Sequence, residues 1–169
     1  LTKPIKTGFA KCATVRLSNI NLKTSFNSPD PLSASAAKIP KILITSGEPA
    51  GIGPDLCVLL AKKKLNAAIT VMADRNTIES RANMRGEHIQ ISDDSTNANT
   101  PHLGDGSLNV WHHPANTPAV AGKLNPANSA HVLDMLTNAT HACMRGGFDA
   151  MVTAPVHKGI INEAGFAFS

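Results

Sequence analysis

The chain contains 169 residues, of which 42% are hydrophobic and 17% are charged, so its composition is that of a folded domain. No apolar run approaches the roughly 18 residues of a transmembrane helix, so no membrane partner is expected. The net charge is +4, but residues 1–40 carry +5, which leaves −1 for residues 41–169. The globular part therefore lacks the basic surface that binds nucleic acid.

Residues 1–40 differ from the rest of the chain. They are rich in Ser, Thr, Asn and Lys and contain a single acidic residue, Asp30. This composition is like that of an organellar transit peptide, although no Arg-rich amphipathic helix is evident. We expect a disordered extension over residues 1–40 and a globular part over residues 41–169. No secretory signal is visible, so a cytoplasmic location is expected.

The first half of the globular part shows two strand-to-helix units. In order, we predict a strand at 42–45, a glycine-containing loop at 47–53, a helix from Pro54 to the lysines at 62–64, a strand at 69–73 and a helix from Asp74 to about Met84. Pro54 suits a first helical turn because its missing N–H needs no partner there. Asp74 is predicted to cap the second helix with its carboxylate.

The second half continues the alternation. We predict a loop at 92–106, a strand at 108–111, a long helix opened by Asn125-Pro126 and ended by Gly146-Gly147, a buried strand at 150–153 and a short helix from about Lys158. Strands that alternate with helices form parallel sheets with helices packed on their faces. The predicted fold class is therefore α/β.

The first candidate site is the segment 47–55, which connects a strand to a helix. Glycines at this point let backbone N–H groups approach an anion, and the helix dipole adds positive potential. Leu56 stands where a third glycine would complete the dinucleotide fingerprint, and no lysine follows to form a P-loop. The spacing alone fits a tight strand-to-helix connection equally well.

The second candidate site is the segment 153–162, which follows a strand at its C-terminal end, where open α/β sheets bind ligands. His157 is a titratable base and Lys158 a cation, and such a pair suits phosphate or carboxylate binding. Taken alone, the pair is more often part of a solvated loop. A third segment, 124–128, is explained by an Asn that caps a Pro-started helix.

The cysteines and histidines predict no metal site. The three cysteines are far apart and contain no CxxC pair, so neither a disulfide framework nor a zinc knuckle is indicated. Cys57 and Cys143 lie in apolar helical patterns and are interpreted as small buried hydrophobes. The adjacent His112 and His113 would point apart on a strand, and no other histidines have metal-ligand spacing.

Three sequence segments are more informative about the protein family than the spacing of their glycines, prolines and histidines. ITSGEPAGIGPDL, LNPANSAHVLDML and FDAMVTAPVHKGIINEAG occur in this order, and together they resemble the 4-hydroxythreonine-4-phosphate dehydrogenase family over residues 41–169. The resemblance implies a three-layer α/β/α fold similar to that of isocitrate and isopropylmalate dehydrogenases, incomplete in this chain. It also implies a homodimer that oxidises a small phosphorylated substrate, 4-phosphohydroxy-L-threonine, with NAD or NADP in vitamin B6 biosynthesis. The product would lose CO2 to give 3-amino-2-oxopropyl phosphate, assisted by a divalent metal such as zinc, magnesium or cobalt.

The same resemblance assigns candidate site residues. His157 and Lys158 match the family's loop beside the cleft and are the predicted catalytic residues. The predicted substrate- or cofactor-binding residues are Gly47, Glu48, Gly51, Gly53 and Asn162. The family's metal-binding histidines correspond to positions after Ser169, so we predict no metal ligand in this chain. We therefore expect residues 41–169 to be the N-terminal part of the enzyme fold and to be inactive as a fragment.

Two alternatives stay open at this point. The complete protein could oxidise a related four-carbon sugar-acid phosphate, such as threonate or erythronate 4-phosphate, because the residues that select the substrate are expected in the other half. Alternatively, the chain is a non-catalytic module that binds phosphate or pairs with another chain. Assays on both substrates separate the two activities, and a soluble monomer with a cooperative thermal transition would favour the module.

Overall fold

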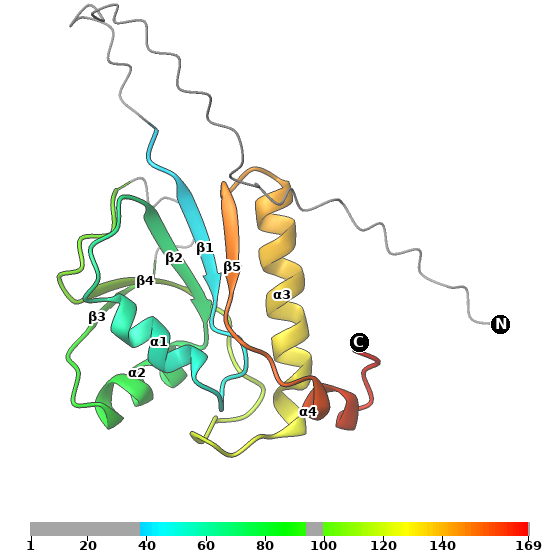
Figure 1. Cartoon of the computed structure of the whole chain (residues 1–169). Coiled ribbons are helices and arrows are strands. Elements are labelled where there is room, and N and C mark those ends of the chain that lie inside the picture. Colours follow the sequence, from blue (N-terminus) through cyan, green and yellow to red (C-terminus); the bar gives the residue numbers. More distant parts are fainter. Residues whose placement is uncertain (1–37, 94–99, 169) are drawn as a thin grey trace, which may run out of the picture. The chain divides into compact units, whose positions relative to one another are not determined.

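The computed structural model describes residues 38–93 and 100–168, which form alternating strands and helices (Figure 1). In chain order the elements are β1 (Lys41–Thr45), α1 (Gly53–Leu60), β2 (Ala68–Ala73), α2 (Arg75–Met84), β3 (Gln90–Ser92), β4 (Ser107–His112), the 3-10 helix η1 (Pro126–Asn128), α3 (Ser129–Met144), β5 (Ala150–Thr153) and α4 (Lys158–Glu163). This order confirms the predicted α/β class.

The strands form one parallel five-stranded sheet in the order β3-β4-β2-β1-β5. β2 is buried at every position, as expected for a central strand of a parallel sheet with helices on both faces. The chain places β2, β3 and β4 on one side of β1 and then returns to add β5 on the other side. The strand order therefore reverses between β1 and β5.

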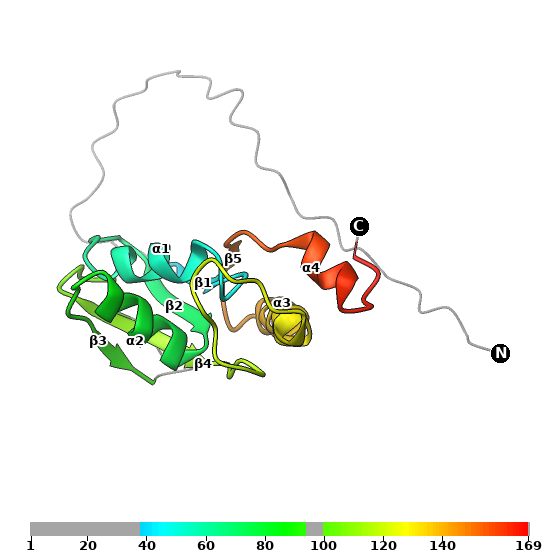
Figure 2. The same cartoon turned by 90° about the horizontal axis from the view of Figure 1, so that it is seen from below.

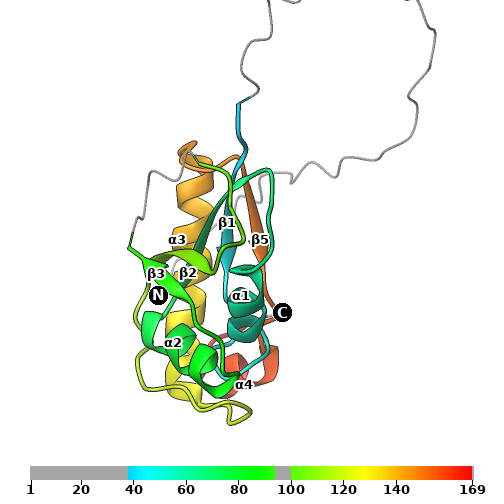
Figure 3. The ribbon, with the colours of Figure 1, turned by 90° about the vertical axis from the view of Figure 1, so that its left-hand side faces the viewer.

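Helices cover both faces of the sheet and produce three layers (Figures 2 and 3). Successive strand residues point to opposite faces. Val71 of β2 accordingly belongs to the core cluster that contains Val58 of α1 and Ile78 of α2. Its neighbour Met72 belongs to a second cluster, with Met135 of α3, on the opposite face. The α/β/α arrangement thus follows from the alternation of side chains along β2.

The short helix α4 packs beside the N-terminal end of α3 (Figure 1). Ile160 and Ile161 of α4 form a small buried cluster with Val132 of α3. The hydroxyl of Ser129 also donates to the carbonyl of Ile160 at 3.2 Å. The segment that follows β5 is therefore anchored to α3.

The structure corrects the sequence prediction in three places. An unpredicted short strand, β3, takes Ser92 from the predicted loop, because its three mostly polar residues pair with β4 but carry no strand pattern. α1 ends at Leu60, so the lysines at 62–64 lie beyond the helix. β5 was expected to be buried, but it is an edge strand of the described sheet and Val152 is 52% exposed.

Both predicted Asx caps are confirmed. One carboxylate oxygen of Asp74 accepts from the N–H of Thr77 at 2.7 Å, and the other accepts from the N–H of Ala115 at 2.9 Å. The side-chain oxygen of Asn125 accepts from the N–H of Ala127 at 3.0 Å. The long predicted helix therefore starts as the 3-10 turn η1 and continues as α3.

The extension expected over residues 1–40 lies, up to residue 37, outside the described residues. Within the described part, the carbonyl of Pro40 accepts from the N–H of Ala68 at 2.8 Å. Lys38 forms an exposed ion pair with Asp149 at 2.9 Å. Contacts with the sheet therefore begin before β1. Over the described residues, no helix combines the length and apolar character needed to cross a membrane.

The two cysteines in the described part differ in burial. Cys57 is buried, and burial raises the pKa of its thiol to about 12, as expected for an inert core thiol. Cys143 is only half-buried, which corrects the prediction for this residue, although burial still raises its pKa. The third cysteine, Cys12, lies outside the described residues.

Candidate functional site

Two loops leave the sheet side by side where the strand order reverses. β1 ends at Thr45 and β5 ends at Thr153, and these two residues are paired in register. Directly beyond them, the N–H of Ala154 donates to the carbonyl of Thr45 at 3.0 Å. Open α/β sheets bind ligands outside the carboxyl ends of their strands at such a reversal. The two motifs predicted from the sequence therefore start at one place, although they are far apart in the chain.

Gly47 permits the close approach of these two loops. Its φ angle of +69° is in the left-handed region, and a β-carbon would lie 2.8 Å from the carbonyl oxygen of Ala154. The next residue, Glu48, donates its N–H to the carbonyl of Pro155 at 3.0 Å. Any other residue at position 47 would therefore be strained and would push the second loop away.

Gly53 has a similar steric role at the start of α1. A β-carbon there would overlap the carbonyl oxygen of Ser46 and would lie 2.9 Å from the β-carbon of Ala154. Gly51 is less constrained, because the nearest atom to a β-carbon would be the carbonyl oxygen of Glu48 at 3.2 Å. The glycines of the first loop thus have a packing function that the sequence did not distinguish from ligand binding.

Glu48 is turned back onto its own loop. Its side chain is buried, with the residue 4% exposed, and Oε1 accepts from the N–H of Ala50 at 3.1 Å. A carboxylate that accepts from backbone N–H groups stabilises the loop conformation that presents them. Glu48 therefore organises the first loop from inside.

Arg81 of α2 is an additional residue of this region that the sequence did not reveal. Its guanidinium donates to the carbonyl of Pro49 at 3.1 Å and to the carboxylate of Asp55 at 2.9 Å. Arg81 is 6% exposed, and it lies on the buried face of α2 with Ile78 and Ala82. A basic residue on the apolar face of a helix was the available signal, because an Arg is rarely buried without a partner.

His157 caps α4. Its Nδ1 accepts from the N–H of Ile160 at 3.0 Å, so the neutral ring carries its proton on Nε2 in this arrangement. The side chain is otherwise exposed. His157 can therefore present an Nε2–H donor toward solvent while its other nitrogen holds the helix start.

Lys158 and Asn162 both contact the segment after α4. The ammonium of Lys158 lies 5.9 Å from the centre of the Phe168 ring, within cation–π range. The side-chain oxygen of Asn162 accepts from the N–H of Phe168 at 2.8 Å. Lys158 and Asn162 remain exposed, so both side chains are oriented by Phe168 without being removed from solvent.

The third motif joins the same edge of the sheet. Asn128 is 2% exposed, and its side-chain oxygen accepts from the N–H of Thr117 at 2.9 Å. The segment that contains Thr117 is also tied to the first loop, because the N–H of Gly122 donates to the carbonyl of Ala50 at 2.8 Å. All three motifs are thus connected by hydrogen bonds near the carboxyl ends of the strands.

Two histidines form a pair that the sequence did not predict. The rings of His113 and His131 are stacked, with centroids 5.0 Å apart. Burial lowers the pKa of both rings, and the neighbouring His113 lowers the pKa of His131 further. His131 is anchored through Nδ1 to the carbonyl of Pro114 at 3.0 Å, while no described residue hydrogen-bonds to its Nε2. Across the described ranges, no group of three His, Cys, Asp or Glu residues could hold a metal ion.

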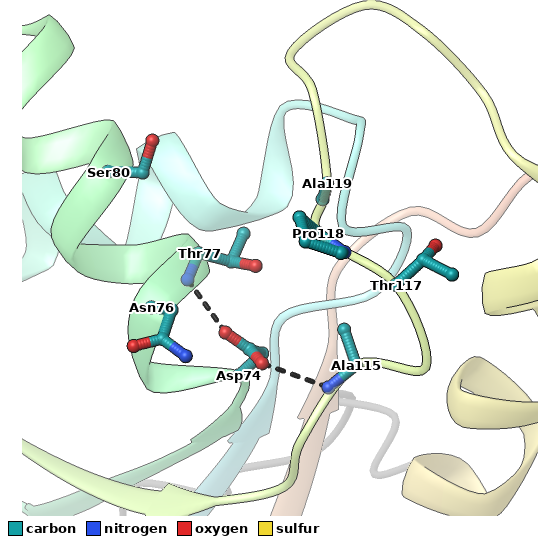
Figure 4. A pocket seen from close by; sticks show the side chains of 8 residues that line it. All are labelled: Asp74, Asn76, Thr77, Ser80, Ala115, Thr117, Pro118 and Ala119. Atoms are coloured by element: carbon teal, nitrogen blue, oxygen red, sulfur yellow. Dashed lines mark hydrogen bonds between the residues drawn. The ribbon is translucent and has the colours of Figure 1, made fainter.

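A pocket opens between the start of α2 and the segment 115–119 (Figure 4). Its volume is about 290 Å³, and it is lined by Asp74, Asn76, Thr77, Ser80, Ala115, Thr117, Pro118 and Ala119. The pocket lies beyond the carboxyl end of β2, next to β1 in the sheet. The fold is that of an α/β protein with a parallel sheet, a class whose members bind ligands at the carboxyl ends of the strands.

Comparison with known proteins specifies the family. The family model described as "pyridoxal phosphate biosynthetic protein PdxA" matches residues 65–169. A 4-hydroxythreonine-4-phosphate dehydrogenase from Methylococcus capsulatus is 45% identical over 130 residues, which are 77% of this chain and 39% of that protein. The chain belongs to the PdxA family. Its named relatives are oxidoreductases, and it spans about two fifths of their length.

Solved structures agree on the fold. A 4-hydroxythreonine-4-phosphate dehydrogenase from Klebsiella pneumoniae superposes with a TM-score of 0.67 at 21% identity, covering 76% of this chain and 41% of that one. A terephthalate 1,2-cis-dihydrodiol dehydrogenase from Burkholderia xenovorans superposes with a TM-score of 0.60 at 22% identity, covering 77% of this chain and 38% of that one. The fold is therefore shared by dehydrogenases with different named substrates.

Proposed function

We propose that the complete protein oxidises 4-phosphohydroxy-L-threonine with NAD or NADP and that the product decarboxylates to 3-amino-2-oxopropyl phosphate, in pyridoxal phosphate biosynthesis. The relatives named 4-hydroxythreonine-4-phosphate dehydrogenase support this substrate. We also propose that the complete protein is a cytoplasmic homodimer. Residues 41–169 would then be the N-terminal part of the fold, inactive as a fragment.

One structural observation carries the proposal for the site. The N–H of Glu48 donates to the carbonyl of Pro155 at 3.0 Å, and this bond joins the two family motifs where the strand order reverses. Residues that are distant in sequence but joined at a ligand-binding edge are what a shared active site requires.

The catalytic role is proposed for His157 and Lys158. Both side chains are exposed and leave adjacent positions at the start of α4. The Nε2–H of His157 would donate a hydrogen bond, and the ammonium of Lys158 would supply a fixed positive charge to the substrate phosphate or carboxylate. Asn162 would support binding from the same helix by holding Phe168 in place beside Lys158.

The first loop is proposed to bind substrate or cofactor mainly through its backbone. Gly47 and Gly53 allow close packing against the second loop, and Gly51 and Glu48 shape the turn between them. Among the described residues no side chain caps the start of α1, so the N–H groups of Gly53 and Asp55 would be available to an anionic group of the ligand, whereas Pro54 has no N–H.

The family implies a nicotinamide cofactor and a divalent metal, and only the cofactor fits the described residues. The pocket beside β2 has the polar residues Asp74, Asn76 and Thr77 in its lining, and these would contact a polar part of a nicotinamide cofactor. A bound nicotinamide cofactor would supply the hydride acceptor for oxidation of the alcohol. A divalent metal does not fit, because the described residues hold no three-ligand group. Its ligands are proposed to lie in the part of the relatives that this chain does not span.

The test uses a chimera in which residues 1–168 are followed by the remaining length of the Methylococcus capsulatus relative. With a divalent metal, we expect the chimera to reduce NAD or NADP in the presence of 4-phosphohydroxy-L-threonine, and the 169-residue chain to be inactive. His157→Ala and Lys158→Ala should each lower kcat/KM by about 100-fold. Lys63→Ala, an exposed lysine beyond α1, is the matched control and should be neutral.

The same assay separates the alternatives. Turnover of erythronate or threonate 4-phosphate but not of 4-phosphohydroxy-L-threonine would replace the proposed substrate. Turnover by the 169-residue chain itself would show that the missing part is not essential. Inactivity of a folded chimera on all three compounds would support a non-catalytic module.

A further inference from the structure

The segment between β4 and η1, residues 113–125, lies across the carboxyl end of the sheet, and we call it the strap. Apart from an isolated bridge between Val120 and Lys123, its residues belong to no strand or helix. Hydrogen bonds hold it to four other parts of the chain: Pro114 to His131, Ala115 to Asp74, Thr117 to Asn128 and Gly122 to Ala50. Figure 4 shows the bond from Ala115 to Asp74. Since no sheet ladder fixes the strap, its position depends on individual bonds of this kind.

His131 of α3 is covered by the start of the strap. The residue is 2% exposed, its ring stacks on that of His113, and its Nδ1 lies 3.0 Å from the carbonyl oxygen of Pro114. A carbonyl only accepts, so Nδ1 carries the hydrogen and the neutral ring has a bare lone pair at Nε2. Within the described part of the chain, this buried Nε2 has no hydrogen-bond partner. A second proton would therefore place an unpaired N–H and a positive charge in a buried site.

The charged groups around the two rings do not compensate for that proton. Asp74 and Asp134 favour the charged form of His131, and the neighbouring ring opposes it. Asp134 also favours the charged form of His113, which His112 opposes. Both oxygens of Asp74 already accept backbone hydrogen bonds, and Asp134 is exposed to solvent. Burial outweighs the two carboxylates and lowers the pKa of each ring, so both rings are held neutral while the strap is in place.

Hydration of a protonated His131 requires movement of the strap, because α3 itself is fixed. Val132 and Met135, on the same helix, are fully buried and belong to two core clusters. Rotation of α3 would therefore disrupt close packing on both sides of the ring. Every residue of the strap, in contrast, is at least partly exposed. Lifting the strap thus requires the least free energy of the motions that bring water to the ring.

We propose that the strap is a proton-sensitive fastening of the candidate site, closed while His113 and His131 are neutral and released from α3 when either is protonated. Acid favours release, because a freed ring has the ordinary histidine pKa of about 6.5 and the covered ring has a lower one. Gly122 of the strap donates to the carbonyl of Ala50 at 2.8 Å, so release also frees the first loop. The inference rests on the proposed function in one respect: the first loop is taken to bind the ligand, whose affinity then falls in acid.

The first experiment measures amide hydrogen exchange by NMR in the 169-residue chain and in the chimera, at about pH 7.5 and about pH 5.5. Each rate is divided by that of an unstructured chain at the same pH, which gives a protection factor. The reporters are the amides of Ala115, Thr117 and Gly122, which donate the bonds of the strap. We expect their protection to fall at least about fivefold at the lower pH, while protection in β2 is retained. Unchanged protection of the strap would overturn the proposal, and so would an equal loss in β2, since the whole fold would then be opening.

The second experiment removes the titrating groups. His131→Gln keeps a side-chain N–H that can donate to the carbonyl of Pro114, and His113→Phe keeps a stacked ring. Each substitution should lessen the loss of protection in acid, and the double variant should abolish it. His141→Gln, at an exposed position on α3, is the control and should lose protection as the unsubstituted chain does. The same loss in all of these proteins would contradict a role of the histidine pair.

The two proposals fail separately, because exchange is measured without substrate. Release of the strap in acid, in a chimera that does not oxidise 4-phosphohydroxy-L-threonine, would keep the strap and reject the proposed activity. Oxidation by a chimera whose strap keeps its protection at the lower pH would keep the activity and reject the strap. Oxidation with a released strap, and with a substrate KM that rises in acid at least about threefold more than in the double variant, would support both.

Discussion

Arg81 and Asp55 form a buried ion pair, with Nη1 of the guanidinium 2.9 Å from Oδ2 of the carboxylate. The pair ties α2 to α1. Through its second donor, Arg81 also holds the carbonyl of Pro49 at 3.1 Å. Arg81 of α2 thus positions the glycine-containing loop that follows β1, although α2 itself contains none of the three family motifs.

Removal of this guanidinium should be strongly destabilising. In Arg81→Leu, Asp55 loses its nearest partner while its side chain is only 15% exposed, and breaking a buried pair costs about 3 kcal/mol. Urea unfolding measures the change. The double variant Arg81→Leu with Asp55→Leu should recover part of the loss, because no buried charge remains unpaired and Arg85, the second partner of Asp55 at 3.8 Å, is exposed to solvent. A loss below about 1 kcal/mol for the single variant would contradict the assigned role.

Gly53→Ala should disrupt the contact between the two loops. The new β-carbon would overlap the carbonyl of Ser46, and such overpacking costs about 1–3 kcal/mol. Gly51→Ala is the matched control in the same loop, since its nearest contact would be 3.2 Å away. Chemical denaturation should give a clearly larger loss for position 53, and equal losses would show that the loops adjust to each other.

Asn128→Ala should loosen the segment after β4. The substitution leaves the partly buried N–H of Thr117 without the acceptor now 2.9 Å away, at a cost of about 1–3 kcal/mol. Asn125→Ala, which removes an exposed cap of η1, should cost less, about 1 kcal/mol. Hydrogen exchange should show faster exchange at Thr117 in the first variant alone. Unchanged exchange there would reject this account.

The stacked His113 and His131 should make the fold sensitive to acid. Burial lowers the pKa of both rings, whereas the unfolded chain has histidine pKa values of about 6.5. The unfolded state therefore binds more protons below that pH, so the free energy of unfolding is highest above it and declines as pH falls. His112, Asp74 and Asp134 are the charged neighbours, and the two carboxylates only partly offset burial.

Unfolding experiments between about pH 7.5 and pH 5 test this expectation. His113→Phe keeps an aromatic ring against His131 but removes one titrating group, so the decline with acid should be shallower. His141→Gln, at an exposed position on α3, is the control and should follow the unsubstituted protein. The same slope in all three proteins would mean that the stacked pair does not control the response.

The sequence by itself determined the class and order of the fold. Alternating strands and helices, the Asx caps at Asp74 and Asn125, and the motif loops were all predictable, because each depends on residues close together in the chain. The family was also recognisable at this level, since long strings carry it. The helix end at Leu60 and the three-residue strand β3 were not predictable from the sequence, because strand pairing and fraying of helix ends decide such boundaries.

Only the tertiary structure decided which distant groups meet. The contact of Arg81 with Pro49 and the stacking of His113 on His131 both join segments whose separation leaves no periodic signal. The edge position of β5 likewise depends on which strands pair, and an apolar run looks the same with one neighbour or two. The physical reason is that side-chain partners are set by packing of the sheet and its layers, whereas local sequence specifies only the elements that pack.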